Sequence, residues 1–409
     1  MRGAGEELSI GERVAFYRRR RGMSQALLAG LMGRSEDWVS KVERGERQVN
    51  RIDVLVELAR QLRVTLNDLL GEPVLFEGED NNDVPAVRDA LMSPQRLSRT
   101  LFGDAQQPHV APEPIARVTE EVWHQYQNGA VGHVIGVLPG LIKSAQQLEN
   151  DTTDRPSYAR KACAVSARIH HLAATTLSKV GEADLAWIAA ERAMQAADRT
   201  EDPLVLASAA RAGTHALLAV GRFDEAVDLG ETAARWMAPA LRENDPGALS
   251  LYGMLFLRTA IAAARRQDRS TTAELLDQAS AAAERLGEDA NHWQTSFGPS
   301  NVELHRLAAA LELGDVTAVV ERGESVRPTH LPVERQVTHA IDLARALSML
   351  ARDDSALRVL LDAEQKAPQL VRHSSKVREV VRTMYRRAPV SNGKSSPLLG
   401  LAERCGAVR

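Results

Sequence analysis

The feature that most constrains the fold is a repeated helix-to-helix junction in the second half of the sequence. Each junction follows an Ala- and Leu-rich segment and precedes another with apolar residues at i, i+3 and i+4, the spacing of one helix face. The junctions start at Gly181, Gly221, Arg266, Gly314 and Ala351, which are 40, 45, 48 and 37 residues apart. A period of this size holds one helical hairpin, and stacked hairpins bury a continuous core. The pattern therefore predicts an α-solenoid.

Composition supports an all-α fold. Only 4% of the residues are aromatic, and Ala, Leu, Arg and Glu dominate long stretches, which favours helices over sheets. An additional hairpin is suggested by residues 126–130, which precede the apolar segment 138–148. The segment 221–227 resembles the turn and second-helix start of tetratricopeptide (TPR) repeats. That resemblance implies TPR-like hairpins whose first helices line an inner groove.

The N-terminal stretch from Ser24 to Gly45 predicts two short helices joined by a tight turn. Ser24 and Ser35 are placed to accept backbone N–H bonds at helix starts, and Gly33 can end the first helix in a left-handed conformation. An earlier helix should begin at the Ser9–Glu12 capping box. In the second short helix, Val39 and Val42 can face a core. Asp37, Ser40, Lys41 and Arg44 fall on the opposite side.

The first seventy or so residues resemble the XRE family of bacterial and phage repressor-type helix-turn-helix domains. The residues that carry the resemblance are 10–25, Leu28, Ala29, Gly33, 39–45, 55–62 and 66–71. The family implies a five-helix, lambda-repressor-like domain that binds double-stranded operator DNA. By position, it implies DNA-binding roles for Gln25, Arg34, Ser35, Glu36, Asp37, Ser40, Lys41 and Arg44. The alternative is an amphipathic helix in some other small bundle, because a polar outer face is common.

Two adjacent acids depart from the family pattern. Glu36 and Asp37 stand where many relatives carry Gln, Ser, Thr or Arg. Carboxylates near phosphates are unfavourable unless they accept from cytosine N4, so the pair either reads C or repels incorrect sites. Lys41 and Ser40 are then expected to supply the attractive base contacts. The core of this domain is expected to contain Val14, Leu28, Leu31, Val39, Val42, Leu55, Leu58, Ala59, Leu62 and Leu69.

Charge and proline content divide the chain into four parts. Residues 1–71 are the expected helix-turn-helix domain, and the first seventy carry a net charge of +3. Residues 72–114 are the expected acidic linker, since 71–114 have a net charge of −5 and hold six of the 17 prolines. Short helical turns are expected within it near residues 86–101. Residues 115–388 form the expected solenoid for sensing and dimerisation. Residues 389–409 form a flexible tail with a short terminal helix, which could cap the last repeat or fray.

Polar side chains recur inside the first helix of each hairpin, which suggests a ladder along one groove. Arg168 and His171 lie 13 and 10 residues before Gly181, and Ser208 and Arg211 lie 13 and 10 before Gly221. The third repeat breaks the series, because it has Met254 and Leu257 near these positions, although Arg258 directly follows Leu257. The candidate ligand-binding residues are Arg168, His171, Ser208, Arg211, Arg258, Trp293, Phe297, Asn301, His305 and His339. The alternative is that these polar residues form the solvated faces of the helices.

Trp293 and Phe297 belong to an aperiodic segment that precedes the helix bearing Asn301 and His305. Two aromatic rings beside an amide and an imidazole are typical ingredients of a small-ligand pocket. A lone Trp is, however, more often part of a core.

No pattern of catalytic or metal-binding chemistry is found in the sequence. There is no nucleophile elbow, phosphate-binding glycine loop or His-x-x-x-His pair, so neither an enzyme nor a cofactor is expected. The two cysteines, Cys163 and Cys405, are far apart and fit a reducing compartment. Without a recognised signal or membrane-spanning run, the protein is expected to be cytoplasmic.

These features together predict a sequence-specific transcriptional regulator that binds DNA as a homodimer. Its repeats would sense a peptide or small-molecule effector and control the geometry of the dimer. The combination resembles bacterial peptide-sensing regulators that join an XRE domain to TPR-like repeats. The alternative is a DNA-tethered scaffold whose solenoid binds a protein partner without a small effector.

Overall fold

The computed structural model describes residues 9–20, 23–47, 49, 52–62, 64, 84–96, 101, 110–150, 156–326, 328–388 and 396–407. The chain divides into two units, Met1–Gly78 and Glu79–Arg409. In both units the described residues are almost all helical. An isolated β-bridge joins Ala290 and Phe297. The all-α prediction is confirmed.

The first unit contains four described helices. They are α1 (Ile10–Arg20), α2 (Gln25–Leu31), α3 (Glu36–Glu43) and α4 (Ile52–Leu62). The capping box forms as predicted, since the Ser9 backbone N–H donates to Glu12 Oε2 at 2.8 Å. Ser24 and Ser35 accept from the backbone N–H groups of Leu27 and Trp38 at 3.0 and 3.1 Å. The fifth expected helix, 65–71, lies outside the described residues.

The core of the first unit matches most of the predicted positions. Val14, Leu28, Val39, Val42, Leu58, Ala59 and Leu62 are buried together. Leu31 is 44% exposed, so its assignment to the core was wrong. It is the last residue of the short helix α2, whose buried residues are Leu28 and Ala29. The side chains of Leu55 and Leu69 are outside the described part.

The range assigned to the linker contains ordered helical structure. Helix α6 (Val84–Leu91) packs on α9, and a short 3₁₀ turn, η1 (Pro94–Arg96), follows it. Val87 and Leu91 of α6 are fully buried. Arg88 and Arg96 form ion pairs with Glu182 and Glu149 of the repeat helices. Proline and acidic composition therefore did not prevent part of this segment from packing.

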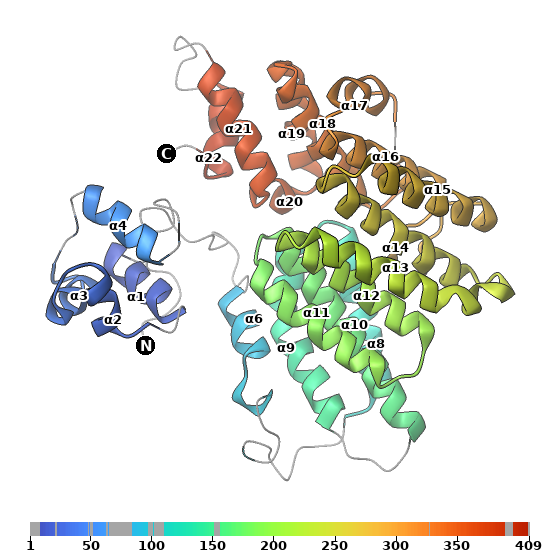
Figure 1. Ribbon diagram of the computed structural model, residues 1–409, viewed down its shortest axis with the longest axis horizontal. Coiled ribbons are helices and arrows are strands. Elements are labelled where there is room, and N and C mark those ends of the chain that lie inside the picture. Colours follow the sequence, from blue (N-terminus) through green and yellow to red (C-terminus); the bar gives the residue numbers. More distant parts are fainter. Residues whose placement is uncertain are drawn as a thin grey trace. The chain divides into compact units, whose positions relative to one another are not determined.

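Helical hairpins make up most of the second unit, as Figure 1 shows. The hairpins are α8 (Pro112–Gln127) with α9 (Val131–Asn150), α10 (Pro156–Lys179) with α11 (Ala183–Asp198), α12 (Pro203–Ala219) with α13 (Phe223–Met237), α14 (Pro246–Arg265) with α15 (Arg269–Leu286), α16 (Pro299–Glu312) with α17 (Val316–Gly323), and α18 (Val333–Met349) with α19 (Asp353–Lys366). The 3₁₀ turns η2 (Ala238–Glu243) and η3 (His292–Gln294) lie between hairpins. All five predicted junctions and the additional one near residue 129 are confirmed.

The first helices of successive hairpins stack on one another. α8, α10, α12, α14, α16 and α18 each contact the next in this series, as expected for a solenoid. At the predicted junctions the chain turns through left-handed backbone, with φ of 84° at Gly181 and 78° at Gly221. Ala351 adopts the same conformation at φ 56°, which is less favourable for a residue with a Cβ.

The repeat array closes on itself. Helix α18 contacts α8, and α20 (Pro368–Arg372) contacts α9. The Gly132 backbone N–H donates to Gln369, and Lys179 Nζ lies 2.5 Å from Glu334 Oε1. The first and last hairpins therefore share an interface, and the stacked first helices surround an interior.

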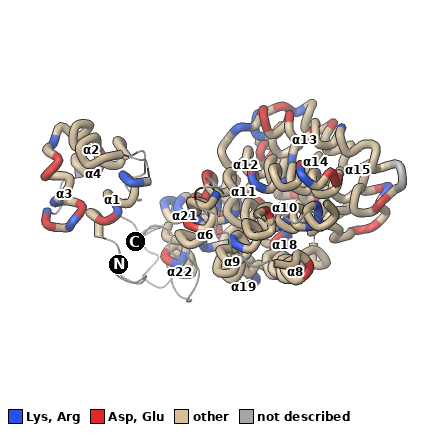
Figure 2. The backbone as a smooth tube through the Cα atoms, turned by 90° about the horizontal axis from the view of Figure 1, so that it is seen from below, with Lys and Arg blue, Asp and Glu red and all other residues tan. Residues whose placement is uncertain are grey.

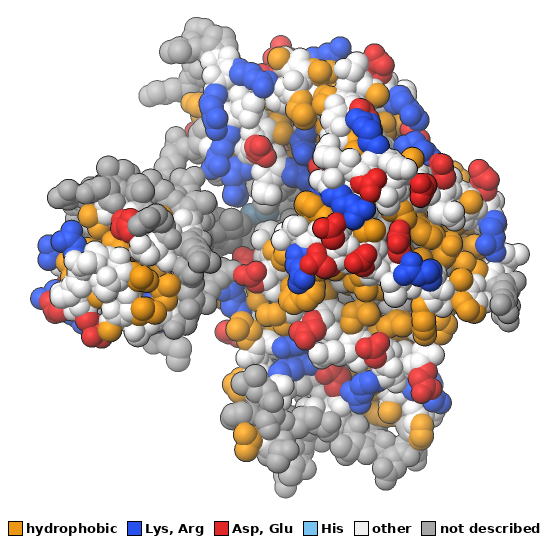
Figure 3. All heavy atoms as spheres, in the orientation of Figure 1, with side chains coloured by type: hydrophobic (Ala, Val, Ile, Leu, Met, Phe, Trp, Pro, Cys, Tyr) orange, Lys and Arg blue, Asp and Glu red, His pale blue; other side chains and the backbone are white. Residues whose placement is uncertain are grey.

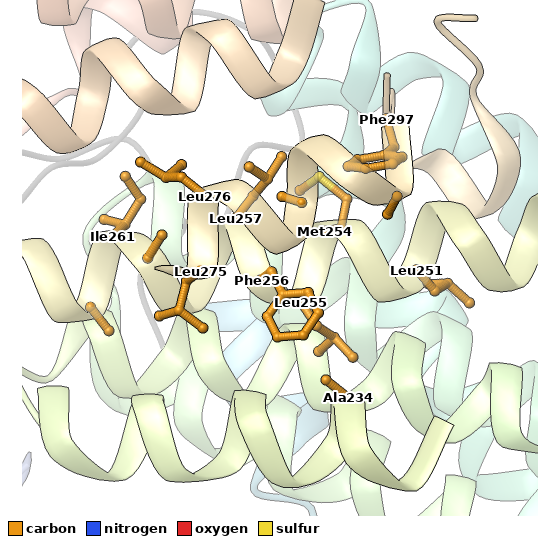
Figure 4. Packing of buried hydrophobic residues seen from close by; sticks show 14 of the residues in the cluster. Ala234, Leu251, Met254, Leu255, Phe256, Leu257, Ile261, Leu275, Leu276 and Phe297 are labelled. Carbon is orange, nitrogen blue, oxygen red and sulfur yellow. The ribbon is translucent and has the colours of Figure 1, made fainter. Parts of the chain in front are cut away.

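Helix α14 is the centre of a large hydrophobic cluster. Figure 4 shows its side chains between Ala234 of α13 on one side and Phe297 on the other. Phe297 is fully buried and packs on Gly253, where a Cβ would lie 1.9 Å from the ring. Among the described residues α14 is the one helix that is long and apolar enough to cross a membrane. Most of its apolar window is buried against neighbouring helices.

The C-terminal segment caps the array. Helix α22 (Pro397–Arg404) packs on α21 (Ser375–Arg387), which contacts α18. Leu401 and Ala402 are fully buried, and Arg404 Nη2 lies 2.7 Å from Glu364 Oε2. Of the two alternatives for this tail, the docked cap is the one present.

Candidate DNA interface and inner cavity

Helix α3 presents a polar face to solvent and an apolar face to the core. Val39 and Val42 are each 1% exposed, whereas Asp37, Lys41 and Arg44 are exposed. Figure 2 shows acidic and basic positions close together at α3. A helix of this length with one free polar face has the dimensions to enter a major groove.

A buried ion pair holds α3 against the other helices of its unit. Arg18 Nε lies 2.5 Å from Glu43 Oε1 at the end of α3, and Gln25 Nε2 donates to Glu43 Oε2 at 2.8 Å. Burial alone would raise the pKa of Glu43. Hydrogen bonds from Arg18 and Gln25 outweigh it and hold this pKa below its ordinary value. Gln25 therefore braces α3, and Arg18 belongs to the same contact.

The remaining candidate DNA-binding side chains lie at or near the exposed surface of α2–α3. Asp37 forms an ion pair with Lys41 at 2.8 Å, and Arg44 donates to Ser40 Oγ at 2.7 Å. The guanidinium of Arg34 lies over the Trp38 ring at 5.7 Å. Ser35 uses its Oγ as the N-cap, and Glu36 is exposed in the first turn.

The second unit encloses a cavity of about 420 Å³ on the inner side of the stacked helices. Four of the predicted ligand-binding residues line it: Arg258, Asn301, His305 and His339. Asn301 is fully buried and His305 is 5% exposed. The first helices thus present these side chains inward, which is the placement that a functional ladder requires.

Three other predicted residues form a filled network beside this cavity. His171 Nδ1 lies 2.9 Å from Ser208 Oγ, and Arg211 Nη2 lies 3.3 Å from His171 Nε2. Because a guanidinium can only donate, Nε2 accepts and Nδ1 carries the proton of a neutral ring. Burial lowers the pKa of His171 well below its ordinary value, which agrees with this neutral form. The space among these side chains is only about 20 Å³.

Arg168 joins three elements near the same network. It lies 2.6 Å from Glu120 of α8, and its guanidinium lies between the rings of Trp123 and Trp293, at 5.8 and 5.1 Å from their centroids. It also donates to Gln294. The residue is an internal bridge, outside the wall of the larger cavity.

The predicted aromatic wall of the pocket does not form. Phe297 belongs to the hydrophobic core, and neither Phe297 nor Trp293 lines the 420 Å³ cavity. Trp293 has a left-handed backbone at φ 55°, which turns its ring toward Arg168 and Gly247. Helical periodicity could not reveal this turn, because the segment is irregular.

Several lining residues were missed in the sequence. Lys179, His215 and Arg335 line the cavity. His215 could have been found, because it lies four residues after Arg211 on the same helix face. Lys179 and Arg335 occupy helix ends, where charged side chains are common and carry no distinguishing signal.

Charge is unevenly distributed around the cavity. Its wall holds five Lys or Arg side chains but only the two acids Glu312 and Asp342. On the outer face drawn in Figure 3, basic and acidic side chains are interspersed. The cationic excess of the cavity wall is not shared by that face. Within the described part of the chain, no group of three or more His, Cys, Asp or Glu side chains could hold a metal ion.

Comparison with known proteins identifies the first unit. Residues 9–70 match the family model described as a helix-turn-helix domain, so the N-terminal unit is a helix-turn-helix domain. No curated protein matches the sequence. The family model covers only this first part of the chain.

Two solved structures show a distant likeness. Bacillus thuringiensis PlcR in complex with the peptide PapR7 and DNA is 13% identical, with a TM-score of 0.30, over 69% of this chain and 96% of that chain. ComR from S. thermophilus in complex with DNA and its signalling peptide ComS is 15% identical, with a TM-score of 0.26, over 74% of this chain and all of that chain.

Proposed function

We propose that this chain is a sequence-specific DNA-binding transcriptional regulator whose helical repeats bind an effector. The observation that carries the proposal is the outward face of α3, with Ser40, Lys41 and Arg44 available to duplex DNA on a domain of the helix-turn-helix family. Ser35 is the N-cap of α3, and the first backbone N–H groups of a helix are a favourable position for a phosphate.

The candidate residues have separable roles. Lys41, with Ser40, contacts base edges, while Arg34 and Arg44 contact phosphates. Gln25 positions α3 through its hydrogen bond to Glu43 and also contacts a phosphate of the DNA backbone. Glu36 and Asp37 reject sites that do not offer a donor at the matching base.

The repeat unit supplies the regulatory part. The inner cavity, lined by Arg258, Asn301, His305 and His339, receives the effector. A bound effector acts by favouring one arrangement of two copies over another. For a helix-turn-helix dimer, the productive separation of the two reading helices is about 34–36 Å.

The DNA-binding proposal is tested by selecting bound fragments from random duplex DNA and titrating the best fragment with variants. Lys41→Ala should cost about 1–3 kcal/mol and relax preference at one base position. Arg44→Ala should weaken binding to all DNA sequences alike. It should also reduce the slope of log affinity against log salt concentration by about 1. Lys161→Ala, an exposed lysine of the repeat unit, is the control and should change neither. Unchanged affinity and preference in Lys41→Ala would refute the assigned role of α3.

A further inference from the structure

Arg258 is an unpartnered cation in the wall of the inner cavity. The other four Lys or Arg side chains of the wall are ion-paired: Lys179 and Arg335 with Glu334, Arg265 with Glu312, and Lys376 with Asp342. Within the described residues, Arg258 makes neither a hydrogen bond nor an ion pair. Arg258 is half-buried, and a guanidinium partly removed from water without a partner is unfavourable unless a bound anion compensates.

Electrostatics around Arg258 favour an anion. Burial, reinforced by the charge of Arg335, lowers the pKa of Arg258 to about 10, so the side chain remains a cation at neutral pH. His215 lines the same space, and burial lowers its pKa well below the ordinary value, so it is neutral. The acids of the wall are already paired with Arg265 and Lys376.

Two hydrogen-bond acceptors lie in the same wall. The Asn301 amide is oriented by its Nδ2, which donates to the Thr295 carbonyl oxygen at 3.4 Å, and its buried Oδ1 has no partner among the described residues. His305 Nδ1 lies 2.9 Å from the Asn301 carbonyl oxygen. Since a carbonyl can only accept, Nδ1 carries the proton and Nε2 of the neutral ring is an acceptor. An unpartnered buried acceptor calls for a donor on the ligand.

Size limits the ligand. A volume of about 420 Å³ lies within the range of small-molecule sites. Toward His171 and Arg211 the inner side is filled by the protein's own side chains, which leave about 20 Å³. An extended chain along the whole array would have to displace that network.

We propose that the cavity binds a small organic anion that also carries hydrogen-bond donors, of the class of amino and hydroxy carboxylic acids. Its carboxylate pairs with Arg258, and its N–H or O–H groups donate to Asn301 Oδ1 and His305 Nε2. This inference rests on the proposed function in taking the cavity as the effector site, and it adds the chemical class of the effector.

The test is thermal unfolding of the full chain with the free L-amino acids and the corresponding 2-hydroxy acids, each beside its primary amide. Sodium chloride at matched ionic strength controls for salt. We expect a subset of the acids to raise the Tm while their amides do not. If amides stabilise as strongly as acids, or if no acid stabilises, the proposal is overturned.

Variants locate the site. Arg258→Gln should lower the affinity for the stabilising acid about 10-fold or more, because a charge-assisted pair is lost. Its Tm without ligand should equal or exceed that of the wild type, since the unpaired cation is removed. Arg222→Gln, an exposed arginine, is the matched control and should bind normally. Full binding by Arg258→Gln would overturn the proposal.

Two further measurements keep the outcome decisive. Should Arg258→Gln fail to fold, Asn301→Asp keeps the side-chain size and adds a repelling charge, and it should also lose the acid. DNA binding is measured on the same preparations. Intact Lys41-dependent DNA binding without acid binding refutes only this inference, whereas acid binding without DNA binding refutes the proposed function instead.

Discussion

At the scale of single residues, the ion pair of Asp37 and Lys41 sets what α3 offers to DNA. Their side chains are 67% and 45% exposed and lie 2.8 Å apart, so the pair contributes little to stability. Its effect is electrostatic, because the carboxylate partly neutralises the cation expected to contact base edges.

Asp37→Asn should raise the affinity for non-specific DNA, since a repelling charge is removed. The slope of log affinity against log salt concentration should become steeper by about 1. Specificity for the selected site should fall at the same time. The measurement is a fluorescence-anisotropy titration at several salt concentrations with selected and scrambled duplexes. Asp198→Asn, on the repeat unit, should behave like the wild type. Equal losses of affinity on both duplexes would contradict this role.

Glu43 gives the first unit a pH-dependent stability. Its folded pKa lies below the ordinary 4.5, so its contribution is complete above pH 4.5 and is lost as the pH falls through the lower folded value. Glu43→Gln leaves Arg18 buried without its charged partner and should cost about 3 kcal/mol at neutral pH. Hydrogen exchange of α1–α3 amides in the full chain, from pH 7 to pH 3, measures both effects.

Glu46→Gln is the control for Glu43→Gln, because Glu46 is exposed and pairs only with surface groups. It should change stability by less than about 0.5 kcal/mol. Identical exchange in the two variants would show that the Arg18–Glu43 pair does not stabilise this unit.

Residue-level prediction succeeded where periodicity carried information. Val39 and Val42 were placed in the core because they stand three apart on a capped helix. Leu31 was misplaced because α2 is too short to define one face by its apolar residues alone. Phe297 and Trp293 were misassigned because their positions depend on left-handed residues in an irregular segment, which no helical period encodes.

At the scale of elements, α22 is a removable cap whose docking can be followed through a thiol. Cys405 is 2% exposed, and burial together with the charge of Glu364 raises its pKa to about 11. Both effects slow its reaction with thiol reagents. Leu401→Ala removes a fully buried side chain and should weaken the docking of α22 by about 2–5 kcal/mol.

The expected result of Leu401→Ala is faster labelling of Cys405, with Cys163 unchanged. Cys163 is also buried, in α10, and serves as an internal control. Mass spectrometry of labelled peptides separates the two thiols. Equal acceleration at both would indicate global unfolding and contradict a local cap.

Element boundaries in the repeat unit were predictable because each junction combines a helix stop with a left-handed residue. The sequence spacing located all of them, including the one at Ala351. Helix α6 was assigned to a linker because Pro and acidic residues dominate its surroundings. Only Val84, Val87, Ala90 and Leu91, at helical spacing, indicated that it packs.

At the scale of the whole molecule, the closure of the array was not predictable. Lys179 and Glu334 are far apart in the sequence, and solenoid periodicity does not encode how far the array turns. Burial alone would raise the pKa of Glu334, but the charges of Arg335 and Lys179 hold it far below its ordinary range. Lys179 has its pKa lowered by burial while Glu334 opposes that shift. The pair therefore joins α10 to α18 at the wall of the cavity.

Removing both members of this pair should cost less than the sum of removing each one alone. Glu334→Gln leaves the cations of Lys179 and Arg335 without their shared carboxylate and should cost about 3–5 kcal/mol. Lys179→Met leaves Glu334 paired with Arg335 and should cost less. The double variant should lose less than the sum of the two by about 1–3 kcal/mol. Urea unfolding of the four proteins measures this coupling. The exposed pair Arg269–Asp315, which joins neighbouring hairpins, is the control and should couple by less than about 1 kcal/mol. Additive losses at Lys179 and Glu334 would mean that the closing contact stabilises the array through packing alone, with no contribution from this ion pair.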